Sequence, residues 1–214
     1  MEDVLVVKFG GSSIASTDLP KWVEAIEKSR RALVIVPGGG PFAKLVRQYQ
    51  TRIGYDDAAA HRMAILGMEQ FGHALVSLGT RLRAAATIDA IAAAHAEGLI
   101  PVWMPAKLVI RADEIEHSWS TTSDSLAAWL AARMDAASLC LIKQIDLPPD
   151  STIEAVSAAG VVDPSFATLL HTATRVFIAG PSDLKVAGRR LSEGTVPGRE
   201  VAHEKQGGFV EAAQ

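Results

Sequence analysis

The chain has 214 residues, of which 49% are hydrophobic and 21% are charged, and this balance excludes a disordered or fibrous protein. A chain of this length buries about 70% of its unfolded surface and needs no disulfide or structural metal to hold a core. With 21 Lys and Arg against 24 Asp and Glu, the formal charge of -3 offers no basic field for nucleic acid or an anionic membrane. Any bound anion must therefore be held by a local cluster of groups.

The composition also predicts a cytoplasmic protein. The N-terminus lacks the basic stretch and small-residue cleavage site of a secretory signal. No apolar run reaches the roughly 18 residues of a membrane span. Cys140 lies within an apolar run, which favours a buried, reduced thiol over a disulfide or a metal ligand.

The first half of the chain alternates short apolar strands with helices. Residues 4–9 form a β-branched run that predicts a strand buried on both faces, and glycines follow it. A helix is expected at about 18–31, then a strand at 32–36 that ends at a second glycine run. Periodicity further predicts helices at 43–50, 58–79 and 87–97 and a strand at 99–104.

The second half continues the alternation. The pattern predicts a short strand at 107–110, a helix at 126–132 after polar residues 118–124, buried strands at 138–145 and 175–179, and an edge hairpin at 194–199. Residues 148–151 (PPDS) indicate either a flexible excursion or a domain boundary. Together these elements predict an α/β fold, a three-layer α-β-α sandwich around a mainly parallel sheet.

Two glycine-rich loops follow consecutive strands, at the edge where open α/β sheets bind ligands. Their unhindered backbone N–H groups suit phosphate oxygens, because a Cβ would keep the backbone away from a bound oxyanion. One such loop alone more often only turns the chain, but two after consecutive strands favour an anion site. The loop residues expected to bind phosphate are Gly10, Gly11, Ser12, Gly38, Gly39 and Gly40.

Three side chains are candidates for the chemistry beside these loops. Lys8 ends the first strand, where its ammonium either reaches over the glycines or is simply solvated. Asp124, in the hydroxyl-rich segment 120–125, either caps a helix with its neighbours or orients the ammonium groups that meet the phosphates. His61 lies on a helix expected over the mouth of the sheet and either contacts the substrate or is a partly exposed histidine.

Several site classes have no motif in the chain. It contains neither a P-loop nor a dinucleotide fingerprint. The histidines lack metal-ligand spacing, so no protein-bound metal is expected. Nucleophile-elbow and zinc-peptidase motifs are absent as well, which leaves hydrolase readings unsupported.

Three segments, in order and spacing, resemble the amino acid kinase superfamily, which includes aspartokinase, N-acetylglutamate kinase, uridylate kinase and isopentenyl phosphate kinase. They are residues 6–13 (VVKFGGSS), 37–40 (PGGG) and 122–128 (TSDSLAA). The resemblance spans almost the whole chain. It implies the carbamate kinase-like fold of that superfamily, in a single domain over residues 1–214 with no regulatory domain.

Within the superfamily, residues 61–68, 122–125 and 141–146 are most similar to the small aspartokinase-related kinases of methanofuran biosynthesis. Those enzymes convert 5-(aminomethyl)-3-furanmethanol phosphate and ATP to the diphosphate and ADP. The resemblance thus implies a kinase acting on a phosphate monoester for one-carbon cofactor biosynthesis. Uridylate, isopentenyl phosphate and carboxylate acceptors stay open, as does a nucleotide-binding storage or regulatory subunit without activity.

The resemblance also implies roles for individual residues. The acceptor would lie at the glycine loops, with His61 and Ser123, while Lys8 bridges the transferred group and Asp124 orients the lysines. Residues 158–164 do not match the Gly-Met-x-x-Lys element that carries a second catalytic lysine in many members; Lys143 is the expected substitute and Lys185 a weaker one. ATP with Mg²⁺ would lie toward the carboxyl-terminal half, and the nucleotide-binding candidates are Asp146, Gly180, Lys185, Gly194 and Thr195. A homo-oligomer is expected.

Overall fold

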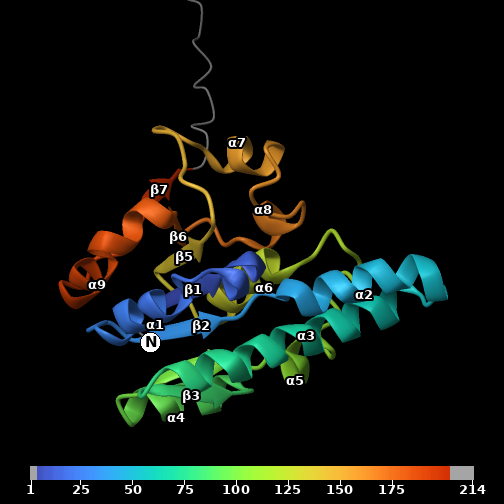
Figure 1. Cartoon of the computed structure of the whole chain (residues 1–214), viewed down its shortest axis with the longest axis horizontal. Coiled ribbons are helices and arrows are strands. Elements are labelled where there is room, and N and C mark those ends of the chain that lie inside the picture. Colours follow the sequence, from blue (N-terminus) through green and yellow to red (C-terminus); the bar gives the residue numbers. More distant parts are fainter. Residues whose placement is uncertain (1–3, 203–214) are drawn as a thin grey trace, which may run out of the picture.

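The computed structural model describes residues 4–202, which form a seven-stranded sheet between two layers of helices (Figure 1). The strands are β1 (Leu5–Phe9), β2 (Leu33–Val36), β3 (Leu82–Ala85), β4 (Ile100–Trp103), β5 (Ser138–Ile142), β6 (Arg175–Ala179) and β7 (Arg199–Val201). Their order across the sheet is β3-β4-β2-β1-β5-β6-β7, and every neighbouring pair is parallel except β6 and β7. The mainly parallel sheet is confirmed.

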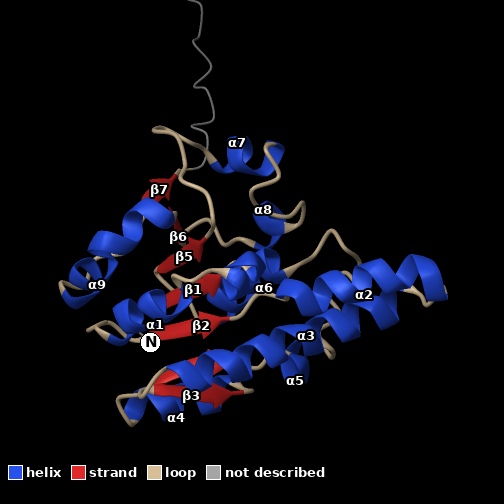
Figure 2. Ribbon diagram, in the orientation of Figure 1, coloured by secondary structure: helices blue, strands red, loops and turns tan. Residues whose placement is uncertain are grey.

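Helices connect the parallel strands, as such crossovers require (Figure 2). They are α1 (Leu19–Glu27), α2 (Gly40–Ile53), α3 (Asp57–Leu78), α4 (Ile88–Ala96), α5 (Ala106–Val109), α6 (Ser123–Arg133), α7 (Ile153–Ala158), α8 (Phe166–Leu169) and α9 (Leu184–Ser192), with 3-10 turns η1 (Gly11–Ala15) and η2 (Pro181–Asp183). No helix within residues 4–202 is long and apolar enough to cross a membrane.

The central strand β1 shows how the sheet builds a core on each face. Leu5, Val7 and Phe9 pack in the cluster that includes α1 and α9. Val6 points to the opposite cluster, which includes α6. Since side chains alternate along a strand, both faces are covered by helices and the three-layer sandwich follows. The same alternation places Lys8 on the α6 side of the sheet.

The two glycine loops lie against each other because β1 and β2 are adjacent and parallel. A Cβ on Gly11 would stand 2.5 Å from the amide nitrogen of Gly40. A Cβ on Gly38 would stand 2.5 Å from the amide nitrogen of Gly11. Glycine is needed in these loops for the close approach of two backbones as well as for access to a ligand.

Several expected elements differ in the structure. Residues 107–110 do not form the expected strand. So short a β-branched run does not distinguish a strand from a helix, and α5 forms one helical turn here that buries Val109. The strand expected at 138–145 ends at Ile142, and 194–199 is not a hairpin but a turn that leads from α9 into the edge strand β7. Strand β3 was not expected, because its sequence LRAA carries little apolar signal.

Helices α2 and α3 pack side by side as a pair that projects from the sheet, on the right of Figure 1. Helix α2 starts directly at the second glycine loop, at Gly40, which adopts φ +53°. Residues on this helix pair are therefore carried to the carboxyl edge of the sheet, next to both loops.

We predict that Gly38→Ala destabilises the protein by about 1–3 kcal/mol, the usual cost of overpacking, because the added methyl group meets backbone atoms of Phe9 and Gly11. Gly98 is a suitable comparison, since it has φ +71° and no atom within 4 Å of a built Cβ. Gly98→Ala should cost only the left-handed backbone penalty of roughly 1 kcal/mol. Chemical denaturation of both variants measures the difference, and equal stability of Gly38→Ala and the unmodified protein would contradict the loop contact.

Candidate active site

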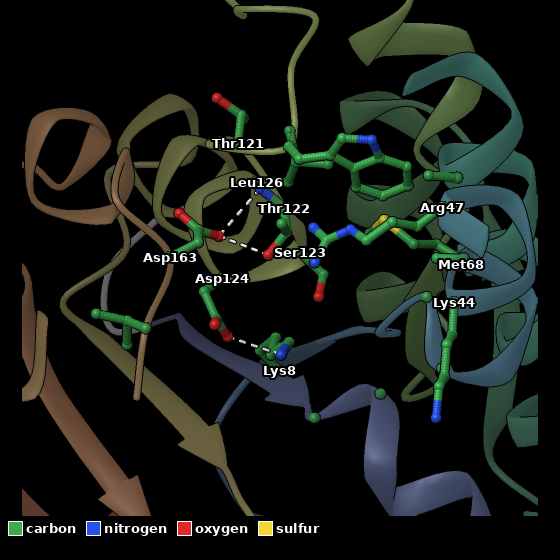
Figure 3. Close-up of a pocket in the computed structure, with 18 of the residues that line it drawn as sticks. Lys8, Lys44, Arg47, Met68, Thr121, Thr122, Ser123, Asp124, Leu126 and Asp163 are labelled. Carbon is green, nitrogen blue, oxygen red and sulfur yellow. Dashed lines mark hydrogen bonds and ion pairs between the residues drawn. The ribbon is translucent and has the colours of Figure 1, made fainter. Parts of the chain in front are cut away.

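A cavity of about 560 Å³ opens at the carboxyl edge of the sheet, between the glycine loops, the α2–α3 pair, the start of α6 and the segment between α7 and α8 (Figure 3). Ten of the residues singled out from the sequence line it: Lys8, Gly10, Gly11, Ser12, Gly39, Gly40, His61, Ser123, Asp124 and Lys143. Gly38 packs beneath the loops and does not line the cavity.

The centre of the site is one carboxylate between two ammonium groups. Asp124 Oδ1 lies 2.7 Å from Lys8 Nζ, and Asp124 Oδ2 accepts a hydrogen bond of 2.7 Å from Lys143 Nζ. The side chains of Lys8, Asp124 and Lys143 are 4%, 8% and 13% exposed. Three elements supply them, namely β1, the first turn of α6 and the end of β5, and these strands are neighbours in the sheet.

Burial and charge act in opposite directions on this cluster. Burial raises the pKa of the Asp124 carboxyl, but Lys8 and Lys143 together lower it by a larger amount, so that the net shift is downward. Burial, assisted by the charge of Lys8, lowers the pKa of Lys143 to about 8, although Asp124 and Asp163 oppose this shift. Asp124 is therefore an anion at neutral pH, and Lys143 is a cation that loses its proton near pH 8.

The carboxylate of Asp124 is free to meet both lysines because another residue caps its helix. Thr122 is the N-cap residue of α6, but its side chain makes no capping hydrogen bond within the helix. Asp163, from the segment between α7 and α8, accepts hydrogen bonds from the backbone N–H groups of Thr122 (3.0 Å) and Ser125 (3.1 Å). Capping therefore does not account for Asp124, and the lysine-orienting interpretation is the one that the geometry supports.

His61 is buried, so the alternative of a partly exposed histidine is wrong. It is 5% exposed and stacks on His117, with ring centroids 4.7 Å apart. Burial and the neighbouring His117 lower the pKa of His61 to about 4. At neutral pH the ring is uncharged, and His61 adds no cation to the cavity.

Two cations on α2 line the cavity and were missed in the sequence. Lys44 and Arg47 make no ion pair within the described part of the chain. The guanidinium of Arg47 lies 4.3 Å from the centre of the Trp119 ring, and Trp119 Nε1–H donates to Gln50 Oε1 at 2.6 Å. Figure 3 shows Arg47 extending from α2 into the cavity. Two basic residues spaced i, i+3 directly after a glycine loop were the available signal.

The residues expected to bind nucleotide lie outside this cavity. Asp146 Oδ1 accepts hydrogen bonds from the backbone N–H and the hydroxyl of Ser182, at 3.0 and 2.8 Å, and Gly180 packs against it. Lys185 lines a separate cavity of about 470 Å³ between α1 and α9. Gly194 and Thr195 end α9, where the N–H of Thr195 donates to the carbonyl of Arg190 at 2.8 Å. Lys143, and not Lys185, reaches Asp124.

The charge of the cavity suits anionic ligands. Its lining combines four cations, Lys8, Lys44, Arg47 and Lys143, with the two carboxylates Asp124 and Asp163. Within residues 4–202, no group of three or more His, Cys, Asp or Glu side chains is arranged to hold a metal ion.

Comparison with known proteins gives one family. Residues 3–147 match the model of the amino acid kinase family. The [5-(aminomethyl)furan-3-yl]methyl phosphate kinase of Methanocaldococcus jannaschii is 28% identical over 145 residues, and this match covers 66% of the present chain and 66% of the relative. The chain thus aligns with just under two thirds of the length of that protein.

Solved structures of uridylate kinases share the fold. The enzyme from Archaeoglobus fulgidus superposes with a TM-score of 0.70 at 14% identity, covering 94% of this chain and 100% of that one. UMP kinase from Ureaplasma parvum gives 0.67 at 16% identity, with coverage of 94% and 100%. The glycine loops, the Lys8–Asp124 pair and the family match over two thirds of the sequence agree, and the chain belongs to the amino acid kinase family.

Proposed function

We propose that this protein is an ATP-dependent kinase that transfers the γ-phosphoryl group to a phosphate monoester. The observation that carries the proposal is the buried Lys8–Asp124–Lys143 cluster beside two glycine loops. Four cations around one cavity are more than a single monoanionic ligand needs. The positive charge that exceeds the two carboxylates of the lining suits two phosphate-bearing reactants that must come together.

Charge repulsion is the main obstacle to such a transfer. Two unit charges about 4 Å apart repel by roughly 4 kcal/mol at an effective dielectric of 20, and each phosphate carries more than one charge. The ammonium groups of Lys8 and Lys143 and the loop amides are fixed before substrate arrives, so they stabilise the transferred charge without reorganisation.

The state of the cavity carboxylates favours an acceptor that arrives already ionised, as a phosphate monoester or a carboxylate does. Both carboxylates of the cavity are engaged: Asp124 with two lysines, and Asp163 with the start of α6. An alcohol acceptor would need one of them to take up its proton. A phosphate monoester, whose second pKa is near 6, is mostly ionised at neutral pH and needs no base. Its dianionic charge also matches the unpaired Lys44 and Arg47.

Among phosphate monoesters we propose 5-(aminomethyl)-3-furanmethanol phosphate, which would become its diphosphate in the synthesis of a methanofuran-type one-carbon carrier. The kinase from M. jannaschii, whose name contains this substrate, supports the choice, as does a cavity lined by the flat side chains of Trp119 and neutral His61. Uridylate and isopentenyl phosphate are the alternatives.

The cations that line the cavity suit the phosphates of ATP. We propose that Lys143 and the segment 160–164 hold the phosphates of ATP, and that Lys44, Arg47 and the glycine loops hold the acceptor. Mg²⁺, bound through phosphate oxygens, would supply further neutralisation of charge. Four further expectations stay predictions. They are a homo-oligomeric assembly, a cytoplasmic location, a single domain without a regulatory domain, and nucleotide contacts of Asp146, Gly180, Lys185, Gly194 and Thr195.

A screen of acceptors tests the proposed function. The protein is incubated with Mg-ATP and each of the three phosphate monoesters, and with aspartate and N-acetylglutamate, while coupled ADP release is recorded. Release with the furanmethanol phosphate, with its diphosphate detected by ³¹P NMR, is the expected result. Release only with a carboxylate, or tight ATP binding without ADP from any acceptor, contradicts the proposal; the second outcome favours a storage or regulatory subunit.

Removal of Lys8 should stop catalysis without unfolding the protein. We predict that Lys8→Ala lowers kcat by about a hundredfold or more, the effect of losing one oxyanion partner. For Asp124→Asn we expect a large fall in kcat with a modest change in the KM for ATP, because the lysines lose their common partner. Steady-state kinetics beside thermal unfolding separate the two effects; near-normal turnover of Lys8→Ala would remove it from the mechanism.

The pH dependence should report on Lys143. Its pKa of about 8 lies below the ordinary value of lysine, so the ammonium is lost as the pH rises through 8. We therefore predict that kcat/KM, which reflects the free enzyme, falls above about pH 8. Lys143→Arg keeps its charge at high pH and should retain its activity there relative to its own maximum. A flat alkaline profile in the unmodified protein would show that Lys143 does not act as a cation.

Arg47 should determine the affinity for the acceptor. We predict that Arg47→Ala raises the KM of the phosphate acceptor by about tenfold or more, on the scale of one charge-assisted hydrogen bond, and leaves the KM for ATP nearly unchanged. Arg52 is the matched control, because it also lies on α2 over an aromatic ring, that of Tyr49, but does not line the cavity. An equal effect of Arg52→Ala would attribute the change to helix stability.

A further inference from the structure

Asp163 is a buried carboxylate that the proposed chemistry does not use directly. It is 8% exposed and lies between α7 and α8, in the segment where the sequence lacks the second lysine of other family members. Its Oδ2 accepts three hydrogen bonds, from the Thr122 N–H (3.0 Å), the Thr122 hydroxyl (2.7 Å) and the Ser125 N–H (3.1 Å). The Ser125 hydroxyl donates to Oδ1. Figure 3 shows Asp163 facing Thr122 across the cavity wall.

These contacts anchor one residue before Asp124, Thr122, and one after it, Ser125. Thr122 is the N-cap of α6 and Ser125 is in its first turn, so the segment that carries Asp124 is held at both ends. A second set of contacts joins the same parts of the chain. The Ser165 N–H donates to the carbonyl of Ser120 at 3.2 Å, and the Thr121 hydroxyl donates to Ser165 Oγ at 3.1 Å.

Burial of a carboxylate is costly unless hydrogen bonds and an opposite charge or dipole compensate for it. Asp163 is compensated by four donors and by the positive end of the α6 dipole. A serine or threonine at the N-cap, the usual solution, would satisfy one N–H group without adding charge. A carboxylate supplied by a distant segment does more, because it fixes α6 relative to the wall of the cavity.

We propose that Asp163 is a positioning residue of this kinase, which acts by holding the first turn of α6 so that Asp124 keeps Lys8 and Lys143 at the transferred phosphoryl group. The proposal rests on the proposed function for its catalytic consequence.

Asp163 also acts through its charge on Lys143. The groups that face Lys143 are Lys8 from β1, Asp124 from α6 and Asp163, and the two carboxylates raise its pKa while Lys8 and burial lower it.

The test compares Asp163→Asn with Asp56→Asn in the full chain. Asp56 is the N-cap of α3, where its Oδ1 accepts from the Ala59 N–H at 2.7 Å, but it does not line the cavity. For Asp163→Asn we expect kcat to fall by roughly tenfold to a hundredfold, with the KM of ATP and of the acceptor changed by less than about threefold. The alkaline limb of kcat/KM should move to lower pH. Asp56→Asn should alter neither kcat nor this limb.

A measurement without substrate separates this proposal from the proposed function. NMR titration of isotope-labelled lysine in the free protein gives the pKa of Lys143, which should fall in Asp163→Asn and stay unchanged in Asp56→Asn. If no acceptor is phosphorylated, the kinase proposal fails, and the titration still shows whether Asp163 sets the state of the lysine cluster. If Asp163→Asn does not fold, Ser125→Ala, which removes one hydroxyl donor but keeps the charge of Asp163, should lower kcat by a smaller factor and leave both KM values nearly unchanged.

Two results would overturn the proposal. The first is a lower melting temperature for Asp163→Asn with an unchanged kcat and an unchanged alkaline limb, which would make Asp163 a helix cap and nothing more. The second is an unchanged pKa of Lys143 in the titration of Asp163→Asn.

Discussion

The site depends on one electrostatic arrangement, a buried carboxylate shared by two ammonium groups. Without Asp124, Lys8 and Lys143 would be like charges that repel each other in a poorly solvated place. With it, both cations are held at fixed positions that face the glycine loops. The two lysines also lower the pKa of the Asp124 carboxyl, which makes it a poor proton acceptor and matches an acceptor that arrives ionised.

The sheet supplies the geometry for this arrangement. Strands β1 and β5 are parallel neighbours, so the residues at their carboxyl ends meet at one edge. Alternation along β1 turns Lys8 toward the face that α6 covers, and α6 begins at the same edge. The α2–α3 pair adds Lys44 and Arg47 from the opposite side, and the segment between α7 and α8 closes the site with Asp163. Each wall therefore comes from a different part of the chain.

Contacts within the protein hold the walls of the cavity in place before a ligand binds. The glycine loops contact each other through backbone atoms, and Asp163 binds the start of α6 through four donors. Arg47 is held over Trp119, which is itself fixed by Gln50. Charged groups that are ordered before the ligand arrives lose little entropy on binding, and this is the condition under which they favour the transition state over the ground state.

Lys143 was expected as a partner of Lys8 and Asp124 only from the resemblance to the amino acid kinase superfamily. The local pattern of the sequence was sufficient for the sheet's central strands, the two glycine loops, and Lys8 and Asp124 as candidates, because apolar runs, glycine clusters and strand ends are read over a few residues. It was insufficient for β3, α5, the burial of His61 and the roles of Arg47 and Asp163. An edge strand such as β3 owes its pairing to β4, and neutral His61 owes its lowered pKa to burial and to His117, a residue 56 positions away. Asp163 caps a helix that starts 40 residues before it. Contacts of this kind join segments that are remote in sequence, and only the folded chain brings them within reach of one another.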